Sequence, residues 1–187
     1  MKTVFSRKSL RALVEAGVMI ALAQLLSYIK FFEMPLGGSI TPASMLPILF
    51  FAVRWGPRWG LGAGVTYGLL QFLLDAKYPS PVFDIPVLAY GLVMVLDYLV
   101  AFGALGLAGF FKGRRLALVW GVLVGACARF AVHFVSGLIL WATSWLYSLG
   151  YNGGYMGVET AICLVLALAI SGPLKKYIEG RDIPAAA

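Results

Sequence analysis

The 187-residue sequence is poor in the residues that build most metal and redox sites. It contains one histidine, His133, and two cysteines, Cys127 and Cys163, with no Cys/His cluster and no H-E-x-x-H pattern. We therefore expect neither a metal nor a cofactor. Both cysteines fall within apolar runs and lack metal-ligand spacing, so we interpret them as small buried residues rather than as a disulfide.

Motifs for catalysis are also missing. The sequence has no G-x-x-x-x-G-K-[ST] loop, so we do not expect this chain to hydrolyse ATP. His133 and Ser136 are close in sequence, but a serine–histidine dyad normally joins different segments and an oxyanion site, and none is recognisable. We expect no catalytic residues and no enzymatic activity.

Charged residues are scarce, at 12% of the chain against 61% hydrophobic residues, with a mean hydropathy of +0.89. A chain this apolar cannot hide its surface in one water-soluble core, which indicates an integral membrane protein. The net charge of +7 comes from short basic clusters between apolar runs. Such clusters set membrane orientation, so they do not imply nucleic-acid binding.

Six apolar runs predict an all-α, six-helix membrane bundle in a single domain, 1–187. The runs are 10–29, 42–55, 59–76, 90–111, 116–143 and 156–174. The first resembles a secretory signal but is long enough to span and lacks a clear cleavage site, so we expect a retained helix. The second is short for a span of ~20 residues and should be tilted, irregular or joined to ordered loop structure.

Lysine and arginine are distributed very unevenly about these runs. Lys30 and Lys77 mark one side, and the other side carries Lys2, Arg7, Lys8, Arg11, Arg54, Arg58, Lys112, Arg114, Arg115, Lys175, Lys176 and Arg181. Because basic residues favour the cytoplasmic side, both termini are predicted to be cytoplasmic. The outer segments 30–45 and 75–91 are rich in Pro, Gly and aromatic residues, which suits ordered lids or simple interfacial turns.

Counting from the basic clusters at ~1.5 Å per residue places several polar side chains at one depth. Asp97, Arg129, His133 and Glu159 converge in the outer half of the membrane, with Gln71 slightly deeper. An ionisable group inside a membrane costs at least ~2.5 to 3.5 kcal/mol, so such a group usually faces a cavity or a partner. The convergence predicts a ligand pocket open to the outside.

Two of these residues have a structural alternative. We expect Arg129 and Glu159 to form an ion pair that locks helices together, which leaves Asp97 without a protein cation. A cationic ligand could then supply one. Arg129, His133, Gly137 and Trp141 also recur every four residues, so neighbours in the series share a helix face. Gly137 would leave room for a flat ring, although a role in helix packing is the alternative.

Four stretches carry a family resemblance: "SMLPILFFAVRWGPRWGLGAGVTYGLLQFLL", "DYLVAFGALGLAGFF", "ARFAVHFVSGLILW" and "SWLYSLGYNGGYM". Together they resemble the thiamine-specific S-component family of energy-coupling-factor (ECF) vitamin transporters. The resemblance implies a six-helix protein of the bacterial cell membrane that captures thiamine at the outer face. It also implies delivery through a transmembrane T-component and two ATPase subunits as partners.

The resemblance also implies site residues. Asp97 and Tyr98 correspond to a Glu-Tyr pair of the family, with the shorter Asp moving the carboxylate by about one bond. His133, Gly137 and Trp141 match the family's binding helix, and Tyr147 and Asn152 match residues of its binding loop. Met34 stands near the place of a family tryptophan. With Gln71, these nine residues form the predicted thiamine site.

Small residues on the first helix, Ala12, Ala16, Gly17 and Ala21, form two small-xxx-small pairs. In the family such residues pack against the membrane partner, and internal packing is the alternative. Other functions also stay open: an S-component for another cationic or aromatic vitamin or precursor, a structural membrane subunit, or a proton-coupled transporter that uses Asp97, His133 and Glu159 as a relay.

Overall fold

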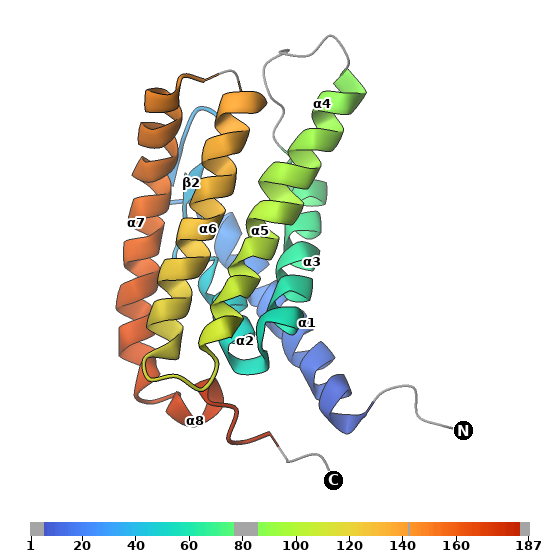
Figure 1. Cartoon of the computed structure of the whole chain (residues 1–187), viewed down its shortest axis with the longest axis vertical. Helices are drawn as coiled ribbons and strands as arrows, with labels where there is room; N and C mark the ends of the chain where they lie inside the picture. Colours follow the sequence, from blue (N-terminus) through green and yellow to red (C-terminus); the bar gives the residue numbers. More distant parts are fainter. Residues whose placement is uncertain (1–5, 77–85, 142, 184–187) are drawn as a thin grey trace, which may run out of the picture.

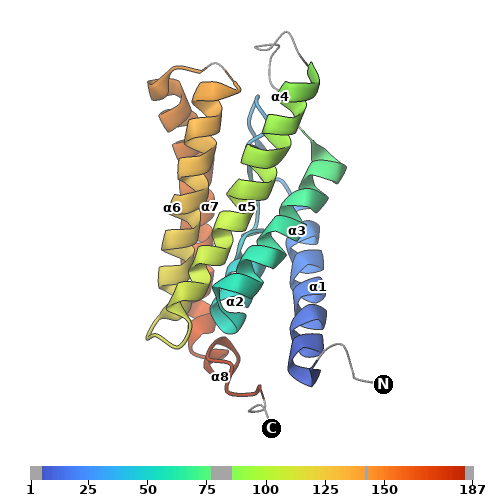
Figure 2. The same ribbon diagram turned by 45° about the vertical axis from the view of Figure 1, so that its right-hand side comes forward.

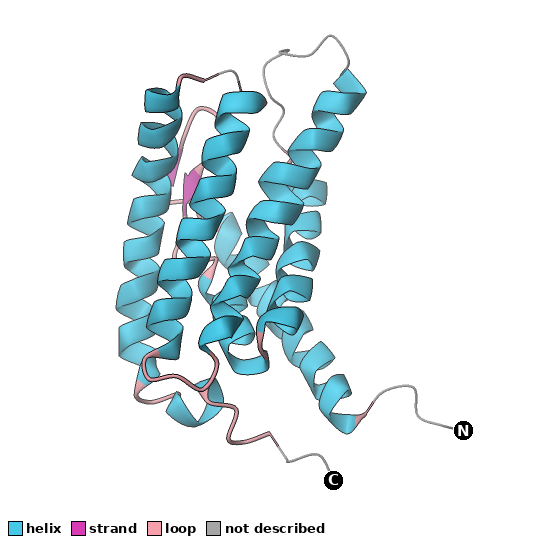
Figure 3. Cartoon of the chain, viewed as in Figure 1, coloured by secondary structure: helices cyan, strands magenta, loops and turns pink. Residues whose placement is uncertain are grey.

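The computed structural model describes residues 6–76, 86–141 and 143–183, and it is helical apart from one small hairpin (Figure 1, Figure 3). The elements are α1 (Arg7–Tyr28), β1 (Phe32–Glu33), β2 (Ser39–Ile40), α2 (Leu46–Trp55), α3 (Pro57–Asp75), α4 (Pro86–Val93), η1 (Met94–Val100), α5 (Ala101–Gly103), η2 (Ala104–Phe111), α6 (Ala117–Ile139), α7 (Trp145–Ser171) and α8 (Lys175–Ile178). The two strands pair antiparallel. Part of the predicted outer segment 75–91 lies outside the described residues.

Within the described residues, four helices are long and apolar enough to cross a membrane. They are α1, the continuous helix Tyr90–Phe111, α6 and α7. The second of these changes its winding along its length, from a π-helical segment in η1 to a 3₁₀ segment in η2. These spans show a multi-pass membrane protein, as the composition predicted.

Helix α2 is short, as the short apolar run 42–55 predicted. Its 10 residues cover ~15 Å, about half of a ~30 Å hydrocarbon layer. Nine of its residues are buried within the chain, so α2 forms the centre of the core. Gly56, at φ 98°, makes the turn from α2 into α3, and this backbone conformation favours glycine.

Helix α3 packs very closely on the helix that carries Asp97. A Cβ added at Gly64 would lie 2.3 Å from the Phe102 carbonyl oxygen, and one added at Gly68 would lie 2.4 Å from the Tyr98 carbonyl oxygen. Glycines spaced four residues apart therefore let two backbones touch. This contact fixes the position of η1 at the centre of the bundle.

The last long helix starts earlier than predicted. We expected a span at 156–174, with the preceding aromatic segment as a loop, but α7 begins at Trp145. Ser144 caps it, since its Oγ accepts a hydrogen bond from the Tyr147 backbone N–H at 3.2 Å. Tyr147 and Asn152 are therefore helical residues, and their assignment to a loop was wrong. Polar residues that face the pocket lower the mean hydropathy of this segment without ending the helix.

The two ends of the bundle differ (Figure 1, Figure 2). The start of α1, the α2–α3 turn, the η2–α6 connection and α8 lie together at one end, which we call the α8 end. The β1–β2 hairpin, the end of α6 and the start of α7 lie toward the other end, which we call the hairpin end. Most of the basic residues in the sequence belong to segments at the α8 end.

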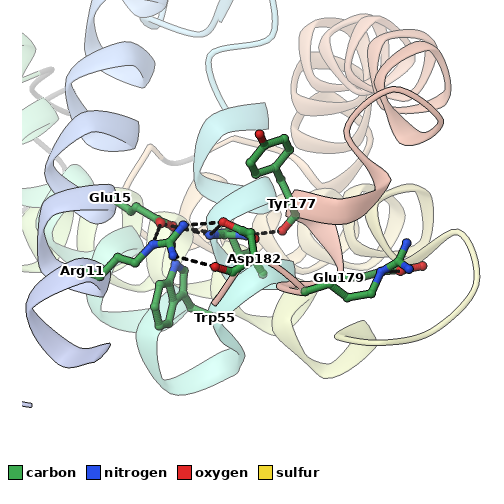
Figure 4. Close-up of polar contacts among 8 residues, drawn as sticks. Arg11, Glu15, Trp55, Tyr177, Glu179 and Asp182 are labelled. Carbon is green, nitrogen blue, oxygen red and sulfur yellow. Dashed lines mark hydrogen bonds and ion pairs between the residues drawn. The ribbon is translucent and has the colours of Figure 1, made fainter. Parts of the chain in front are cut away.

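A polar cluster ties the C-terminal segment to α1 and α2 at the α8 end (Figure 4). The Arg54 side chain is only 4% exposed and pairs with Glu15 and Asp182, with Nε–Oε2 and Nη1–Oδ1 distances of 2.6 and 2.7 Å. Arg11 also pairs with Glu15 and with Asp182. Two arginines and two carboxylates thus balance one another in charge.

The small residues of α1 do not share one environment. Ala12 is fully buried in a cluster with Phe51, Trp55 and Ala63, and Ala16 packs against that cluster. Internal packing therefore accounts for this pair, and Ala12 cannot contact a membrane partner because α2 and α3 cover it. Gly17 and Ala21 remain exposed.

Candidate functional site

A cavity of about 130 Å³ opens among the hairpin, α3, η1, α6 and α7. Its lining includes eight of the nine predicted binding residues and the predicted ion pair. These are Gln71, Asp97, Tyr98, His133, Gly137, Trp141, Tyr147 and Asn152, with Arg129 and Glu159. No cluster of His, Cys, Asp or Glu suited to a metal occurs in the described part of the chain.

Asp97 is a buried carboxylate in the π-helical segment η1, and its residue is 8% exposed. Segments of this kind are often found at functional sites. The Trp141 indole N–H donates to Asp97 Oδ2 at 2.9 Å, and His133 Nδ1 lies 3.2 Å from Asp97 Oδ1. Both contacts hold the carboxylate in the pocket wall.

His133 lies between Arg129 and Asp97. Arg129 Nε–H points at His133 Nε2 over 3.4 Å, and the other ring nitrogen, Nδ1, faces Asp97. Among the described residues, no lysine or arginine forms an ion pair with Asp97.

Arg129 and Glu159 lie at a second polar part of the pocket. The Glu159 carboxylate is 2% exposed, and its Oε1 accepts hydrogen bonds from Thr41 Oγ1 at 2.6 Å and Ser44 Oγ at 2.9 Å. Arg129 Nη1 lies 3.9 Å from Glu159 Oε2, which is beyond hydrogen-bond distance. The guanidinium also lies over the Phe102 ring, 4.3 Å from its centroid.

Gly137 lines the pocket, but its missing side chain serves helix packing. A Cβ at this position would lie 2.3 Å from Ser148 Oγ on α7. The Ser148 hydroxyl donates to the Phe134 carbonyl oxygen at 3.0 Å. The missing side chain at Gly137 therefore lets α6 and α7 pack closely, and room for a ligand ring beside it stays a prediction.

Helix α7 presents a row of tyrosines spaced four residues apart: Tyr147, Tyr151 and Tyr155. The rings of Tyr147 and Tyr151 are stacked, with centroids 5.9 Å apart. Asn152 lies beside them, and its amide donates to the Ser148 carbonyl oxygen at 3.0 Å and to the His133 carbonyl oxygen at 3.4 Å. Its side chain therefore holds α7 against α6.

The first outer segment covers the pocket differently from the prediction. Met34 is not among the residues that line the cavity, and its backbone N–H donates to the Gly38 carbonyl oxygen in the hairpin. Leu36, Gly37, Gly38 and Ser39 line the cavity instead. The Tyr151 hydroxyl accepts hydrogen bonds from the backbone N–H groups of Leu36 at 3.1 Å and Gly38 at 3.0 Å, which ties the hairpin to α7.

The two remaining predicted residues make contacts at the α3 side of the pocket. The Gln71 amide donates to the Tyr67 hydroxyl at 2.7 Å, and the Tyr98 hydroxyl donates to the Asp75 carbonyl oxygen at 3.0 Å. Sequence reasoning missed Tyr67 and Phe102, whose rings meet edge to face with centroids 4.9 Å apart.

Other missed residues had a signal. Tyr151 and Tyr155 follow Tyr147 at helical spacing, so a helical assignment of 145–155 would have placed all three on one face. Thr41 and Ser44 offered no comparable signal, because isolated hydroxyl residues in a loop are common.

The chain is similar to known proteins in three comparisons. The family model described as "Thiamine transporter protein (Thia_YuaJ)" matches residues 13–178. The thiamine transporter ThiT of Bacillus subtilis (strain 168) is 31% identical over 181 residues, covering 85% of this chain and 89% of that protein. A solved structure of ThiT from Listeria monocytogenes superposes with a TM-score of 0.74 at 21% identity, covering 92% of this chain and 99% of that one, and it supports the fold. The chain belongs to the thiamine transporter protein family.

Proposed function

We propose that the pocket binds thiamine and that the chain is the substrate-binding S-component of an ATP-driven energy-coupling-factor transporter. The observation that carries the proposal is the environment of Asp97. This buried carboxylate lines the cavity beside Trp141 and His133, and among the described residues no lysine or arginine forms an ion pair with it. A buried anion needs a compensating charge, and the thiazolium ring of thiamine is a permanent cation.

The aromatic residues complement the rest of the ligand. Trp141 and Tyr147 offer ring faces to a cationic heterocycle, and each such contact contributes up to ~2 kcal/mol when desolvated. Tyr98 and Gln71 offer polar atoms at the α3 side. Asn152 and Gly137 shape the site by holding α6 and α7 together.

The orientation follows from charge. The basic segments gather at the α8 end, and basic residues favour the cytoplasmic side. We infer that the hairpin end faces outward, that the pocket lies in the outer half of the membrane and that both termini are cytoplasmic. Six helical units, α1, α2, α3, the helix from α4 to η2, α6 and α7, would then form the membrane bundle.

The proposed energising partners are a transmembrane T-component and two ATPase subunits. The sequence contains no phosphate-binding loop of its own, which supports an external ATPase. Gly17 and Ala21 stay exposed on α1, and paired small residues permit close helix approach. We assign the partner contact to these two residues.

Calorimetry and tryptophan fluorescence test the proposal on purified full-length protein without partners. Thiamine should bind at one site and quench fluorescence, and Trp141→Phe should remove the quenching, because no other tryptophan of the described residues lines the cavity. Absence of heat and of quenching would reject the proposal. Tighter binding of another vitamin would favour a different S-component, and proton-driven uptake by this chain alone in liposomes would favour the relay alternative.

A further inference from the structure

A second cavity, of about 450 Å³, lies at the α8 end of the bundle (Figure 1). Its walls are residues 113–118 of the η2–α6 connection, the last turn of α7 and helix α8 with the residue after it. We call this cavity the basic groove, because Arg114, Arg115 and Lys175 line it against one acidic residue, Glu179. It shares no lining residue with the central pocket, so it is a separate site.

The positive charges of the basic groove are poorly compensated. Among the described residues, no ion pair includes Arg114 or Arg115, and both side chains are exposed. The Glu179 carboxylate lies 2.7 Å from Arg181 Nε but 4.0 Å from Lys175 Nζ, so Arg181 is its closer partner. The groove therefore keeps a net positive charge.

The basic groove also has apolar walls that face the surroundings of the bundle. Leu116 and Leu168 line it, and both are exposed. Leu168 belongs to α7, one of the membrane-spanning helices, and the exposed Val165 continues the same face three residues earlier. Trp120, exposed on α6 one turn after Leu116, is of the residue type that gathers at membrane–water interfaces. The groove thus lies where the charged end of the bundle meets its lipid-facing surface.

This combination of charge and apolar surface matches one class of ligand. An arginine guanidinium binds phosphate oxygens through paired hydrogen bonds, and a lysine ammonium adds a point charge. Basic pockets at the cytoplasmic ends of membrane helices bind anionic lipid head groups. The exposed leucines would contact acyl chains, which a free phosphate ion does not have.

We propose that the basic groove binds an anionic phospholipid, with the head-group phosphate at Arg114, Arg115 and Lys175 and the acyl chains along Leu116 and Leu168. Under the orientation inferred above, this lipid belongs to the cytoplasmic leaflet. The site does not require that the central pocket binds thiamine, because the two cavities have no residue in common.

Native mass spectrometry of the purified full-length chain in detergent tests the site. Phosphatidylglycerol and phosphatidylcholine with identical acyl chains are titrated separately, so that only the head group differs, and the dissociation constant of the first bound lipid is measured. The wild-type chain should bind phosphatidylglycerol at least about tenfold more tightly, since each basic residue strengthens binding of an anionic lipid severalfold.

Two triple variants separate the groove from the general basic charge of this end. Arg114→Gln, Arg115→Gln and Lys175→Gln together should reduce the preference for phosphatidylglycerol to within about threefold. The matched control combines Arg7→Gln, Lys8→Gln and Arg58→Gln, which removes the same charge from exposed residues outside the groove. The control should keep the wild-type preference.

A third arm distinguishes a lipid from a free phosphate ion. Inorganic phosphate in large excess should displace no more phosphatidylglycerol than sodium chloride does at the same ionic strength, because the acyl chains contribute to binding. Specific displacement by phosphate would overturn the assignment to a lipid.

Other outcomes would also overturn the proposal. Equal wild-type affinities for the two lipids would do so without any variant. Retention of the preference in the groove variant, or an equal loss in the control, would show that the groove is not the binding site. Should the groove triple variant fail to fold, as judged by its melting temperature, Arg115→Gln alone should still weaken phosphatidylglycerol by about threefold, and an unchanged affinity would reject the site. A chain that binds no thiamine would reject the proposed function and leave these lipid measurements unaffected.

Discussion

Trp141 donates its indole N–H to Asp97 Oδ2 over 2.9 Å, so an aromatic wall of the pocket and its anion are held together. The two residues are 44 positions apart in the sequence. Trp141 follows the end of α6, and Asp97 lies in the π-helical segment η1. The contact therefore joins the segment after α6 to η1, at the place where we propose that the thiazolium binds.

Asp97→Asn should weaken thiamine binding by about 2–5 kcal/mol, because truncating one partner of a buried charge pair leaves the other charge uncompensated. An analogue whose second ring is neutral should lose much less affinity. Calorimetry with both ligands makes the comparison. Equal losses would show that Asp97 supports the fold or the other ring.

Trp141→Phe keeps an aromatic face but removes the hydrogen bond to Asp97. We expect a loss of thiamine affinity of about 1.5–3 kcal/mol, the usual contribution of a hydrogen bond to a charged group. Trp141→Ala should cost more, because stacking is also lost. Wild-type affinity in Trp141→Ala would exclude the stacking role, and Trp145→Ala, an exposed residue on α7, is the matched control.

Tyr151→Phe removes the hydroxyl that accepts the Leu36 and Gly38 backbone N–H groups. The hairpin should then leave the pocket more easily, and thiamine should dissociate several-fold faster in stopped-flow fluorescence, since each lost bond contributes about 0.5–1.5 kcal/mol. Tyr28→Phe, which removes an exposed hydroxyl on α1, should leave the rate unchanged. Equal dissociation rates in wild type and Tyr151→Phe would rule out this contact as a restraint.

Gly137→Ala should destabilise the chain by about 1–3 kcal/mol, because the new Cβ would lie 2.3 Å from Ser148 Oγ. Thermal unfolding in detergent measures this effect. The double variant Gly137→Ala with Ser148→Ala should recover part of the stability. Gly154→Ala, where nothing lies within 4 Å of the added Cβ, serves as the control. Loss of stability in the control alone would contradict the packing role.

The cluster at the α8 end predicts a specific pH dependence. Hydrogen bonds from Arg54 hold the pKa of Asp182 below its ordinary value. A lowered pKa in the folded state means that the stabilisation is complete above the unfolded value of about 3.9 and is lost as pH falls through the lower folded pKa. The C-terminal segment should therefore stay docked from pH 8 to 5, as judged by limited proteolysis.

A variant tests the same cluster. Asp182→Asn should lower the melting temperature at pH 7 because Arg54 and Arg11 lose a charged partner. Glu179→Gln, which alters a pair with the exposed Arg181, should change stability by less than about 0.5 kcal/mol. Similar effects of both substitutions would show that the cluster contributes no more than a surface pair.

Patterns in the sequence were sufficient to predict part of the fold and part of the candidate site. The long apolar runs, which exceed what a water-soluble core requires, predicted the long helices. The four-residue recurrence of Arg129, His133 and Gly137 predicted that these residues share one face of α6. Counting from the basic clusters brought Asp97 and Glu159 to one depth. The sequence alone permits these inferences because helix geometry and the cost of burying charge act locally and do not depend on which helices are neighbours.

Only the tertiary structure decided the partners. Asp97 meets Trp141 and His133, Glu159 meets Thr41 and Ser44, and Gly137 makes room for Ser148. Each of these contacts joins different segments of the chain, and periodicity within one segment carries no information about the segment opposite. Composition and helix period thus determined that polar groups would gather inside this membrane protein, and the packing of one helix against another determined which of them remain free for a ligand.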